Sequence, residues 1–419
     1  AEHTQQVTTP VMLEELHQRK QVLKKAAATA EERATIEIVA LMFQSILAEE
    51  RIPSGVRVWF ARLQMPVLRL ALSEPEFFES LQHPARQLID HMGSCVLGFD
   101  AGVQSGAELE LEIKRVVQVI EQYPETGRRA FQLVYEEFQK FLARFLTGKA
   151  VTKKVVSVAQ QVEQKETLAI QYTIELRNTL KDMPVPDSIR DFLYKVWAEV
   201  LAVAAMRQGA QDPETLAFKK LAVDLVWAAG AKPNRSERAK VIADLPPMLQ
   251  RLRQGMALLG MDAAAQDERI KTISDTLAEA FMSKTDAIDR SRIEALAQRL
   301  TNLEDYLEDV SVDDMVVDQE TIEFMDIDAN DLVVIGAGGT EPTEAMRAWA
   351  AELQPGAWFT LDHNNSMQQV QYMWRSDKGQ LHVFSSTHGK NYLIQAKRLA
   401  AYLQAGLLVA VEDESLTVR

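Results

Sequence analysis

The sequence contains a single cysteine, Cys95, in 419 residues, so the chain can form neither an internal disulfide nor a metal site with several cysteines. Long apolar runs are missing as well: none approaches the roughly 20 residues of a membrane-spanning helix. The first residues, AEHTQQVTTP, lack the basic and apolar regions of a signal peptide. These absences predict a cytoplasmic protein without a membrane span. The missing initiator methionine suggests a processed chain or a fragment of a longer one.

Positive charge is absent from one long stretch, because no lysine or arginine occurs between Arg299 and Arg347. The stretch carries fourteen acidic residues: Glu304, Asp305, Glu308, Asp309, Asp313, Asp314, Asp318, Glu320, Glu323, Asp326, Asp328, Asp331, Glu341 and Glu344. The net charge of −14 therefore has a local source, and the rest of the chain is balanced. We expect no nucleic-acid binding of the sequence-independent kind, which needs clustered cations to displace counterions.

Helical periodicity dominates the first 310 residues. Apolar side chains recur at three- and four-residue steps, as in the stripe from Ile36 to Leu47, and such a stripe packs on a core. Pro66 predicts a kink or a division of its helix. Residues 73–76 predict a helix start, with Ser73 as its cap and Pro75 in the first turn. Residues 150–182 predict a longer exposed helix, and Pro246-Pro247 predict the end of another.

The period changes to two beyond Gly356, which is typical of strands. Turns at 377–379 and 388–390 separate these strands, and a helix at 396–406 precedes the last one. The predicted fold is therefore mainly α: a multi-helix scaffold followed by a small antiparallel β-barrel with one helix. A chain of this length holds several cores, and we assign residues 1–150 and 151–310 to helical regions, 311–345 to an acidic linker with a short strand at Leu332–Ile335, and 346–419 to the barrel.

Two patterns resemble sites. His91 and Cys95 have the i, i+4 spacing that places two metal ligands on one helix face, but structural or catalytic zinc needs three or four protein ligands, so helix packing is the favoured alternative. Gly336 to Gly339 resemble a turn that cradles a phosphate. The dinucleotide fingerprint needs a further glycine where the chain has Glu341, which favours a hinge.

Four cations of the predicted barrel form the candidate ligand-binding set: Arg375, Lys390, Lys397 and Arg398. They flank strand ends or the start of the helix, where cationic side chains bind anions such as phosphate. A solvated rim is the favoured alternative. No nucleophile elbow of the GxSxG type occurs, and we expect no catalytic set, metal or cofactor.

Several stretches together resemble a proteobacterial family of unknown function, whose members often carry the label thymidine phosphorylase. They include RIPSGVRVWFARLQMPVLRLALSEPEFFESLQHPARQLIDHMG, FLYKVWAEVLAVAAMRQG and MWRSDKGQLHVFSSTHGKNYLIQAKRLAAYLQAGLL. The phosphate- and pyrimidine-binding signature of a true phosphorylase is not among these residues. Members of the family are typically longer, which agrees with an N-terminal truncation.

The C-terminal part of that family resembles a divergent PilZ domain, a small barrel that in other proteins senses cyclic di-GMP. Its signature pairs an RxxxR motif with [DN]xSxxG. Here Arg347 is the one arginine before the barrel, and Asn364-Asn365-Ser366 begin the second motif, but Gln369 stands at its glycine. The resemblance therefore implies a fold used for protein contact. We expect a non-enzymatic cytoplasmic regulatory or adaptor protein with an unidentified protein partner; the alternative is a cyclic di-GMP receptor.

Overall fold

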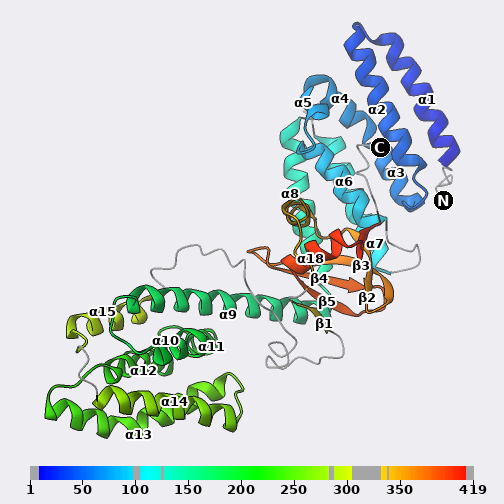
Figure 1. Ribbon diagram of the computed structural model, residues 1–419. Helices are drawn as coiled ribbons and strands as arrows, with labels where there is room; N and C mark the ends of the chain where they lie inside the picture. Colours follow the sequence, from blue (N-terminus) through cyan, green and yellow to red (C-terminus); the bar gives the residue numbers. More distant parts are fainter. Residues whose placement is uncertain are drawn as a thin grey trace. The chain divides into compact units, whose positions relative to one another are not determined.

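The computed structural model describes residues 9–97, 104–123, 127–282, 287–303, 332–336 and 339–411 (Figure 1). The chain divides into two compact units, which are described separately. Unit 1 comprises Ala1–Val156, Ala329–Arg375 and Leu381–Arg419, and unit 2 comprises Ser157–Asp328 and Ser376–Gln380. No helix in the described ranges has the length and apolar character needed to cross a membrane.

Unit 1 begins with helices that each bury apolar side chains. They are α1 (Thr9–Ala26), α2 (Ala30–Ala48), α3 (Ser54–Arg62), α4 (Gln64–Ser73), α5 (Glu76–Glu79), α6 (Pro84–Val96), α7 (Gln104–Gln122) and α8 (Arg128–Leu146). The stripe predicted in α2 is confirmed, because Ile36, Phe43 and Leu47 are all buried. Thr29 and Glu32 form a capping box that starts α2 and separates it from α1.

The division predicted at Pro66 is confirmed: α3 ends at Arg62, and Pro66 lies in the first turn of α4, where no backbone donor is needed. The helix start predicted over residues 73–76 is confirmed, because α5 begins at Glu76 directly after Pro75, but the prediction that Ser73 caps this helix is wrong. Ser73 ends α4, and its hydroxyl donates to the carbonyls of Arg69 (3.1 Å) and Leu70 (3.0 Å). A serine hydroxyl can donate a hydrogen bond to a carbonyl of the preceding turn as readily as it can cap the next helix. The sequence alone does not distinguish these two roles.

The helices of unit 2 surround a second core. They are α9 (Ala150–Leu180, whose first turns belong to unit 1), α10 (Asp187–Phe192), the π-helical segment η1 (Leu193–Trp197), α11 (Ala198–Gln208), α12 (Pro213–Ala229), α13 (Arg235–Leu258), α14 (Ala263–Met282) and α15 (Arg290–Thr301). Trp197 is fully buried at its centre and donates its indole N–H to the carbonyl of Phe218 at 3.1 Å. Asp212 caps α12, as its position before Pro213 predicts.

Two predictions about these helices need correction. The helix at 150–182 exists but is not simply exposed, because Val162, Tyr172 and Leu176 are buried along one face. The helix predicted to end at Pro246-Pro247 continues to Leu258. Both prolines are exposed, so water can reach the carbonyls that they leave without a donor, while Met248, Leu252 and Met256 hold the next turns in the core.

The C-terminal part of unit 1 is a six-stranded sheet with two helices. The strands are β1 (Leu332–Ile335), β2 (Trp358–His363), β3 (Ser366–Arg375), β4 (Leu381–Ser386), β5 (Asn391–Gln395) and β6 (Leu408–Ala410), in the order β1-β5-β4-β3-β2-β6. The helices are α17 (Glu344–Glu352) and α18 (Ala396–Gln404). Phe359, Phe384 and Leu399 join a buried cluster between the sheet and the helices.

The sheet is not the closed antiparallel barrel that the sequence predicted. β1 and β6 are its two edges, and β1 pairs with β5 in parallel, Leu332 opposite Asn391. The predicted strand at Leu332–Ile335 is thus confirmed, and it joins this sheet. Most of the predicted acidic linker 311–345 lies outside the described residues.

Candidate functional site

A tight hairpin places a histidine at one end of the sheet. Asn364 and Asn365 connect β2 to β3 with φ angles of 53° and 59°, and His363 pairs with Ser366 across the turn. A two-residue turn with both residues left-handed matches the twist of the strands, and asparagine tolerates this conformation better than most residues. The side chain of His363 points to the same face as those of Phe359 and Leu361, because the side-chain period of a strand is two.

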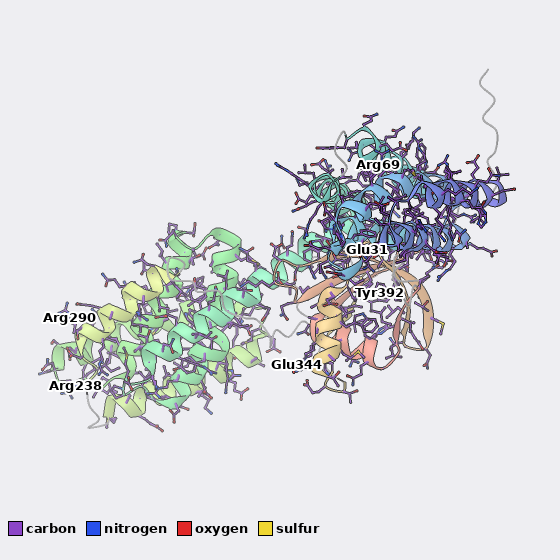
Figure 2. All side chains as sticks on the ribbon, turned by 90° about the horizontal axis from the view of Figure 1, so that it is seen from above. Glu31, Arg69, Arg238, Arg290, Glu344 and Tyr392 are labelled. Carbon is purple, nitrogen blue, oxygen red and sulfur yellow. The ribbon has the colours of Figure 1, made fainter. Side chains whose placement is uncertain are left out.

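Two tyrosines from other elements contact His363. Its Nδ1 lies 2.9 Å from the hydroxyl of Tyr402 on α18, and its ring packs edge-on against Tyr392 of β5, with centroids 6.3 Å apart. Asn364 places its amide nitrogen 3.2 Å from Nε2. If the amide donates there, Nδ1 carries the proton and donates it to the Tyr402 oxygen. Figure 2 shows Tyr392 within the sheet domain, away from Glu344 at the start of α17.

Lys390 and Arg398 are brought together at this end of the sheet. Lys390 Nζ lies 6.0 Å from the Tyr392 ring centroid, and the Arg398 guanidinium carbon lies 5.1 Å from that of Tyr402. The pKa of His363 is lowered by partial burial first, and then by the charges of Lys390 and Arg398, against the opposite effect of Asp362. Both cations therefore act on one imidazole. We call His363, Tyr392, Tyr402, Lys390 and Arg398 the His363 cluster.

The other two predicted cations, Lys397 and Arg375, have different partners. Lys397 Nζ binds Glu341 at 2.7 Å, and Arg347 binds the same carboxylate at 2.9 Å. The hydrogen bond from Lys397 is the main cause of the lowered pKa of Glu341. Arg375 donates to the carbonyl of Ala351 at 2.8 Å. Arg375 pairs with His382 at the start of β4, whereas Lys390 follows its far end, so the four residues do not form one set.

The glycine-rich segment after β1 has a packing role at Gly339. This residue has φ +87°, and a Cβ there would collide with the guanidinium of Arg398. Glycine thus permits a close approach of backbone to side chain. Residues 337 and 338 lie outside the described residues, and the predicted hinge is untested. Glu341, which departs from the phosphate motif, pairs with Lys397 beside Arg398.

His363, Tyr392 and Tyr402 were missed by the sequence reasoning. Part of the signal was present: His363 continues the inward-facing series of Phe359 and Leu361, and Arg398 and Tyr402 have the i, i+4 spacing of one helix face. The missing information was the curvature that brings the ends of β2 and β5 together, since these strands are not neighbours in the sheet.

The sheet is attached to the helices of unit 1 at the loop before β2. His91 on α6 donates from Nε2 to the carbonyl of Pro355 at 2.7 Å, and Trp358 donates its indole N–H to the carbonyl of Cys95 at 3.2 Å. Gly356 has φ +103°, and a Cβ there would lie 2.5 Å from Sγ of Cys95. His91 and Cys95 therefore serve packing, the favoured alternative. In the described ranges, no three His, Cys, Asp or Glu side chains are placed to hold a metal ion.

Burial shifts the pKa values of two side chains on α6, His91 and Cys95. His91 is 6% exposed and lies edge-on to Tyr135 and Phe138, with centroids 5.9 and 5.7 Å away. Burial lowers its pKa, so the ring is neutral. The fully buried Cys95 thiol has its pKa raised for the same reason, which makes it a poor nucleophile.

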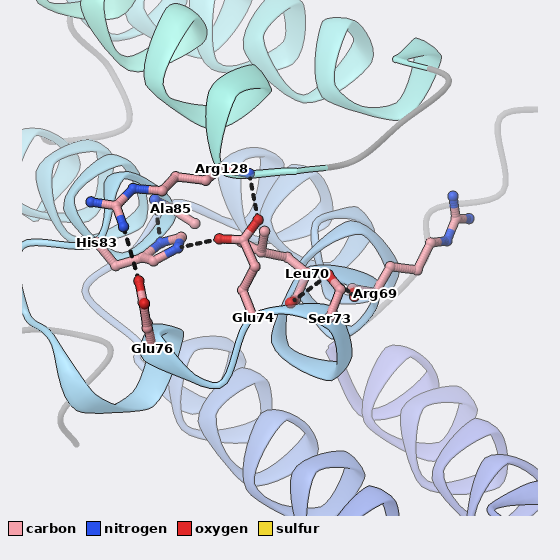
Figure 3. Close-up of polar contacts among 8 residues, drawn as sticks. All are labelled: Arg69, Leu70, Ser73, Glu74, Glu76, His83, Ala85 and Arg128. Atoms are coloured by element: carbon pink, nitrogen blue, oxygen red, sulfur yellow. Dashed lines mark hydrogen bonds and ion pairs between the residues drawn. The ribbon is translucent and has the colours of Figure 1, made fainter.

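A second polar cluster joins α4, α5, α6 and α8 (Figure 3). The N–H of Ala85 donates to Nδ1 of His83 at 3.2 Å, so Nε2 bears the proton that faces Glu74 at 3.4 Å. The backbone N–H of Arg128 donates to Glu74, and its guanidinium binds Glu76 at 3.1 Å. Both nitrogens of His83 are thus engaged in capping and helix packing, and Ser73 bonds to its own helix, so this is a structural cluster.

Three domain profiles of one family match the chain. They are described as "Protein of unknown function (DUF1631) 2nd domain" over residues 1–127, "third domain" over 158–274 and "C-terminal tudor domain" over 345–411. No curated protein and no solved structure showed significant similarity to the chain. The C-terminal description names a tudor domain where the sequence resemblance indicated a PilZ-like one, and none of the three descriptions mentions a phosphorylase. Because the three profiles match in chain order and cover most of its length, the chain belongs to the DUF1631 family.

Proposed function

We propose that the chain is a non-enzymatic adaptor or regulatory protein of the cytoplasm that binds a partner protein through the end of its C-terminal sheet. The His363 cluster carries this proposal. It gathers two cations and three rings at the sheet end where Met367 and the hairpin residues are exposed. Aromatic and arginine side chains of this kind are enriched at the energetic centres of protein interfaces.

The attachment of the sheet to α6 supports the same role. The bonds from His91 and Trp358, together with the close packing at Gly356, order the loop before β2. A pre-ordered surface loses less conformational entropy on binding than a mobile one. The sheet end would therefore meet its partner as part of a fixed surface of unit 1.

The hydrogen bonds of His363 and His83 favour binding over catalysis at these two clusters. His363 contacts Asn364 and Tyr402, and His83 contacts Ala85 and Glu74. Neither arrangement presents an imidazole to a serine or cysteine nucleophile, which acyl-transfer chemistry of the triad type requires.

Photo-crosslinking tests the proposal. A benzophenone amino acid at Met367, which is 73% exposed beside the hairpin, should capture one defined protein in the cell of origin. The control carries the same group at Val22, which is 68% exposed on α1. The same adducts from both positions, or none from Met367 alongside measurable small-molecule turnover, would reject the adaptor role.

A cyclic di-GMP receptor with a PilZ-like use of the sheet is the second candidate. Its support is the convergence of Lys390 and Arg398 at the end that also carries Asn364-Asn365-Ser366. Calorimetry of the full chain with cyclic di-GMP should then give heat that Arg398→Ala abolishes. No heat at millimolar ligand removes this candidate.

A further inference from the structure

Helix α2 has a second apolar face that the fold of unit 1 leaves exposed. Ile38 is 49% exposed and Leu41 is 54% exposed. Ala34 and Ala48 are exposed on the same face, and Ser45 is half-exposed. The stripe on the other side of α2 is buried, and α1 and α4 pack on the helix from other directions (Figure 1). The fold therefore covers only one of the two apolar faces of α2.

The spacing of the exposed positions indicates the kind of partner that fits. Residues 34, 38, 41, 45 and 48 are separated alternately by four and three residues, which is the spacing of the seam in a coiled coil. We call these five residues the α2 seam. Single apolar side chains are common on protein surfaces, but a row with this period matches the surface of another helix.

The charges at the ends of the α2 seam favour an antiparallel pair of helices over a parallel one. Glu31 continues the seam by one position, and in a parallel pair it would meet Glu31 of a second copy. In an antiparallel pair it meets Ala48 instead. Glu50, exposed just beyond the helix, then approaches the first turn of the other α2, where the helix dipole stabilises a negative charge. Arg33 in that turn is exposed, and it forms no ion pair with another described residue.

The side chains of the α2 seam complement a second copy of themselves. A two-fold axis between residues 38 and 41 places Ile38 of each copy against Leu41 of the other, and Ala34 against Ser45. The small side chains at both ends allow the helix axes to approach to about 8–10 Å. Glu37 at the edge of the seam is already neutralised, because Lys24 and Lys20 of α1 bind its carboxylate at 2.6 and 3.6 Å.

From these observations we infer that α2 is a dimerisation helix, on which a second copy of this chain packs its own α2 antiparallel along the seam. The inference goes beyond the proposed function, because it concerns a surface other than the His363 cluster. The face of one helix buries less area than most permanent dimers do, so the association is weak and depends on concentration.

Sedimentation equilibrium of the full chain over a range of concentrations tests the inference. The parent chain should show a monomer–dimer equilibrium. Leu41→Glu should raise the dissociation constant at least about tenfold, because each copy brings a charge into the apolar seam. Leu41 is exposed and glutamate has a similar helix propensity, so the variant should fold. The matched control is Leu111→Glu on α7, at a leucine that is 64% exposed, and it should change the dissociation constant less than about twofold.

Disulfide crosslinking tests the orientation. The native Cys95 is buried and does not compete. A mixture of Ala34→Cys and Ser45→Cys chains should form a disulfide-linked dimer under mild oxidation. Neither variant should do so alone, because the two copies of the same residue lie about 16 Å apart along antiparallel helices, beyond the roughly 7 Å that a disulfide allows between Cα atoms.

Four results would each overturn the inference. They are a parent chain that stays monomeric at every concentration, a dimer that Leu41→Glu leaves unchanged, equal weakening by Leu111→Glu, and a disulfide-linked dimer of Ala34→Cys alone. The adaptor role has a separate readout, since capture of a partner at Met367 does not require α2.

Discussion

A neutral histidine connects the C-terminal sheet to the helices of unit 1. His91 donates from Nε2 to the Pro355 carbonyl, while its Nδ1 is buried without a hydrogen-bond partner. Protonation would add a charge and a second N–H donor at Nδ1, between Tyr135 and Phe138, where no acceptor is described. A buried donor without an acceptor is unfavourable by about 1–3 kcal/mol, so the attachment favours the neutral ring.

This arrangement predicts a pH-dependent stability. Because burial lowers the pKa of His91 in the folded state, the unfolded chain binds more protons than the folded chain below the unfolded pKa of roughly 6.5. The stabilisation from the neutral ring is complete above that pH and decreases as the pH falls towards the folded pKa, by up to about 1.4 kcal/mol per pH unit. Unit 1 should therefore unfold more easily at pH 5 than at pH 7.

The substitution His91→Gln isolates this contribution. Its amide can replace Nε2–H as the donor to Pro355 but cannot titrate. Urea unfolding at several pH values should give a smaller difference between pH 7 and pH 5 for the variant than for the parent chain. His83 and His363, whose pKa values are also lowered, titrate in both proteins and cancel in the comparison. Equal pH dependence of the two proteins would show that His91 does not titrate with folding.

At the scale of elements, α13 crosses two consecutive prolines. A proline inside a helix is disfavoured by about 3 kcal/mol relative to alanine, and a following proline disfavours the helical conformation of the residue before it. Pro246 and Pro247 are both exposed, so their side chains contribute little burial. The helix continues because Met248, Leu252 and Met256 are buried beyond them. Burial of three such side chains contributes roughly 5–9 kcal/mol, which offsets a loss of about 6 kcal/mol from the two prolines.

Pro247→Ala should therefore stabilise unit 2. The change restores one helical donor and relieves Pro246, against about 0.4–1 kcal/mol from the added freedom of the unfolded chain. We expect a net gain of about 1–2 kcal/mol, measured as a higher urea midpoint. Gln250→Ala, at an exposed position one turn later, controls for helix propensity alone. A loss of stability in Pro247→Ala would mean that the bend at the prolines is needed to place Met248 in the core.

The elements differ in how far the sequence determines them. Local patterns predicted α2, the division at Pro66 and the strands β2 to β5, because periodicity and caps act within a few residues. The open sheet was not predictable in this way, since the parallel pairing of Leu332 with Asn391 joins residues far apart in the chain. The same limit applies to the candidate site. The four cations could be identified in the sequence, but their partners could not. Lys397 binds Glu341 and Arg375 binds the carbonyl of Ala351, and only the folded domain brings these residues together.

For the whole molecule, two glycines mark close contacts in separate cores. In unit 1, Gly356 packs on Cys95 with φ +103°. In unit 2, Gly255 lies under Trp197, where a Cβ would be 2.5 Å from the indole ring. The two buried clusters belong to different compact units, so a substitution in one should leave the other unaffected if the units unfold independently.

Native-state hydrogen exchange measured by mass spectrometry tests this independence. Gly356→Ala combines a strained φ angle with overpacking and should destabilise unit 1 by about 2–4 kcal/mol. Peptides from α6 and β3 should then exchange faster, and those from α11 and α12 should not. Gly255→Ala should do the opposite by only about 1–2 kcal/mol, because the better helix propensity of alanine offsets part of the overpacking. If either variant accelerates exchange in both sets of peptides, the two units unfold as one, and a partner bound at the His363 cluster would then stabilise unit 2 as well as unit 1.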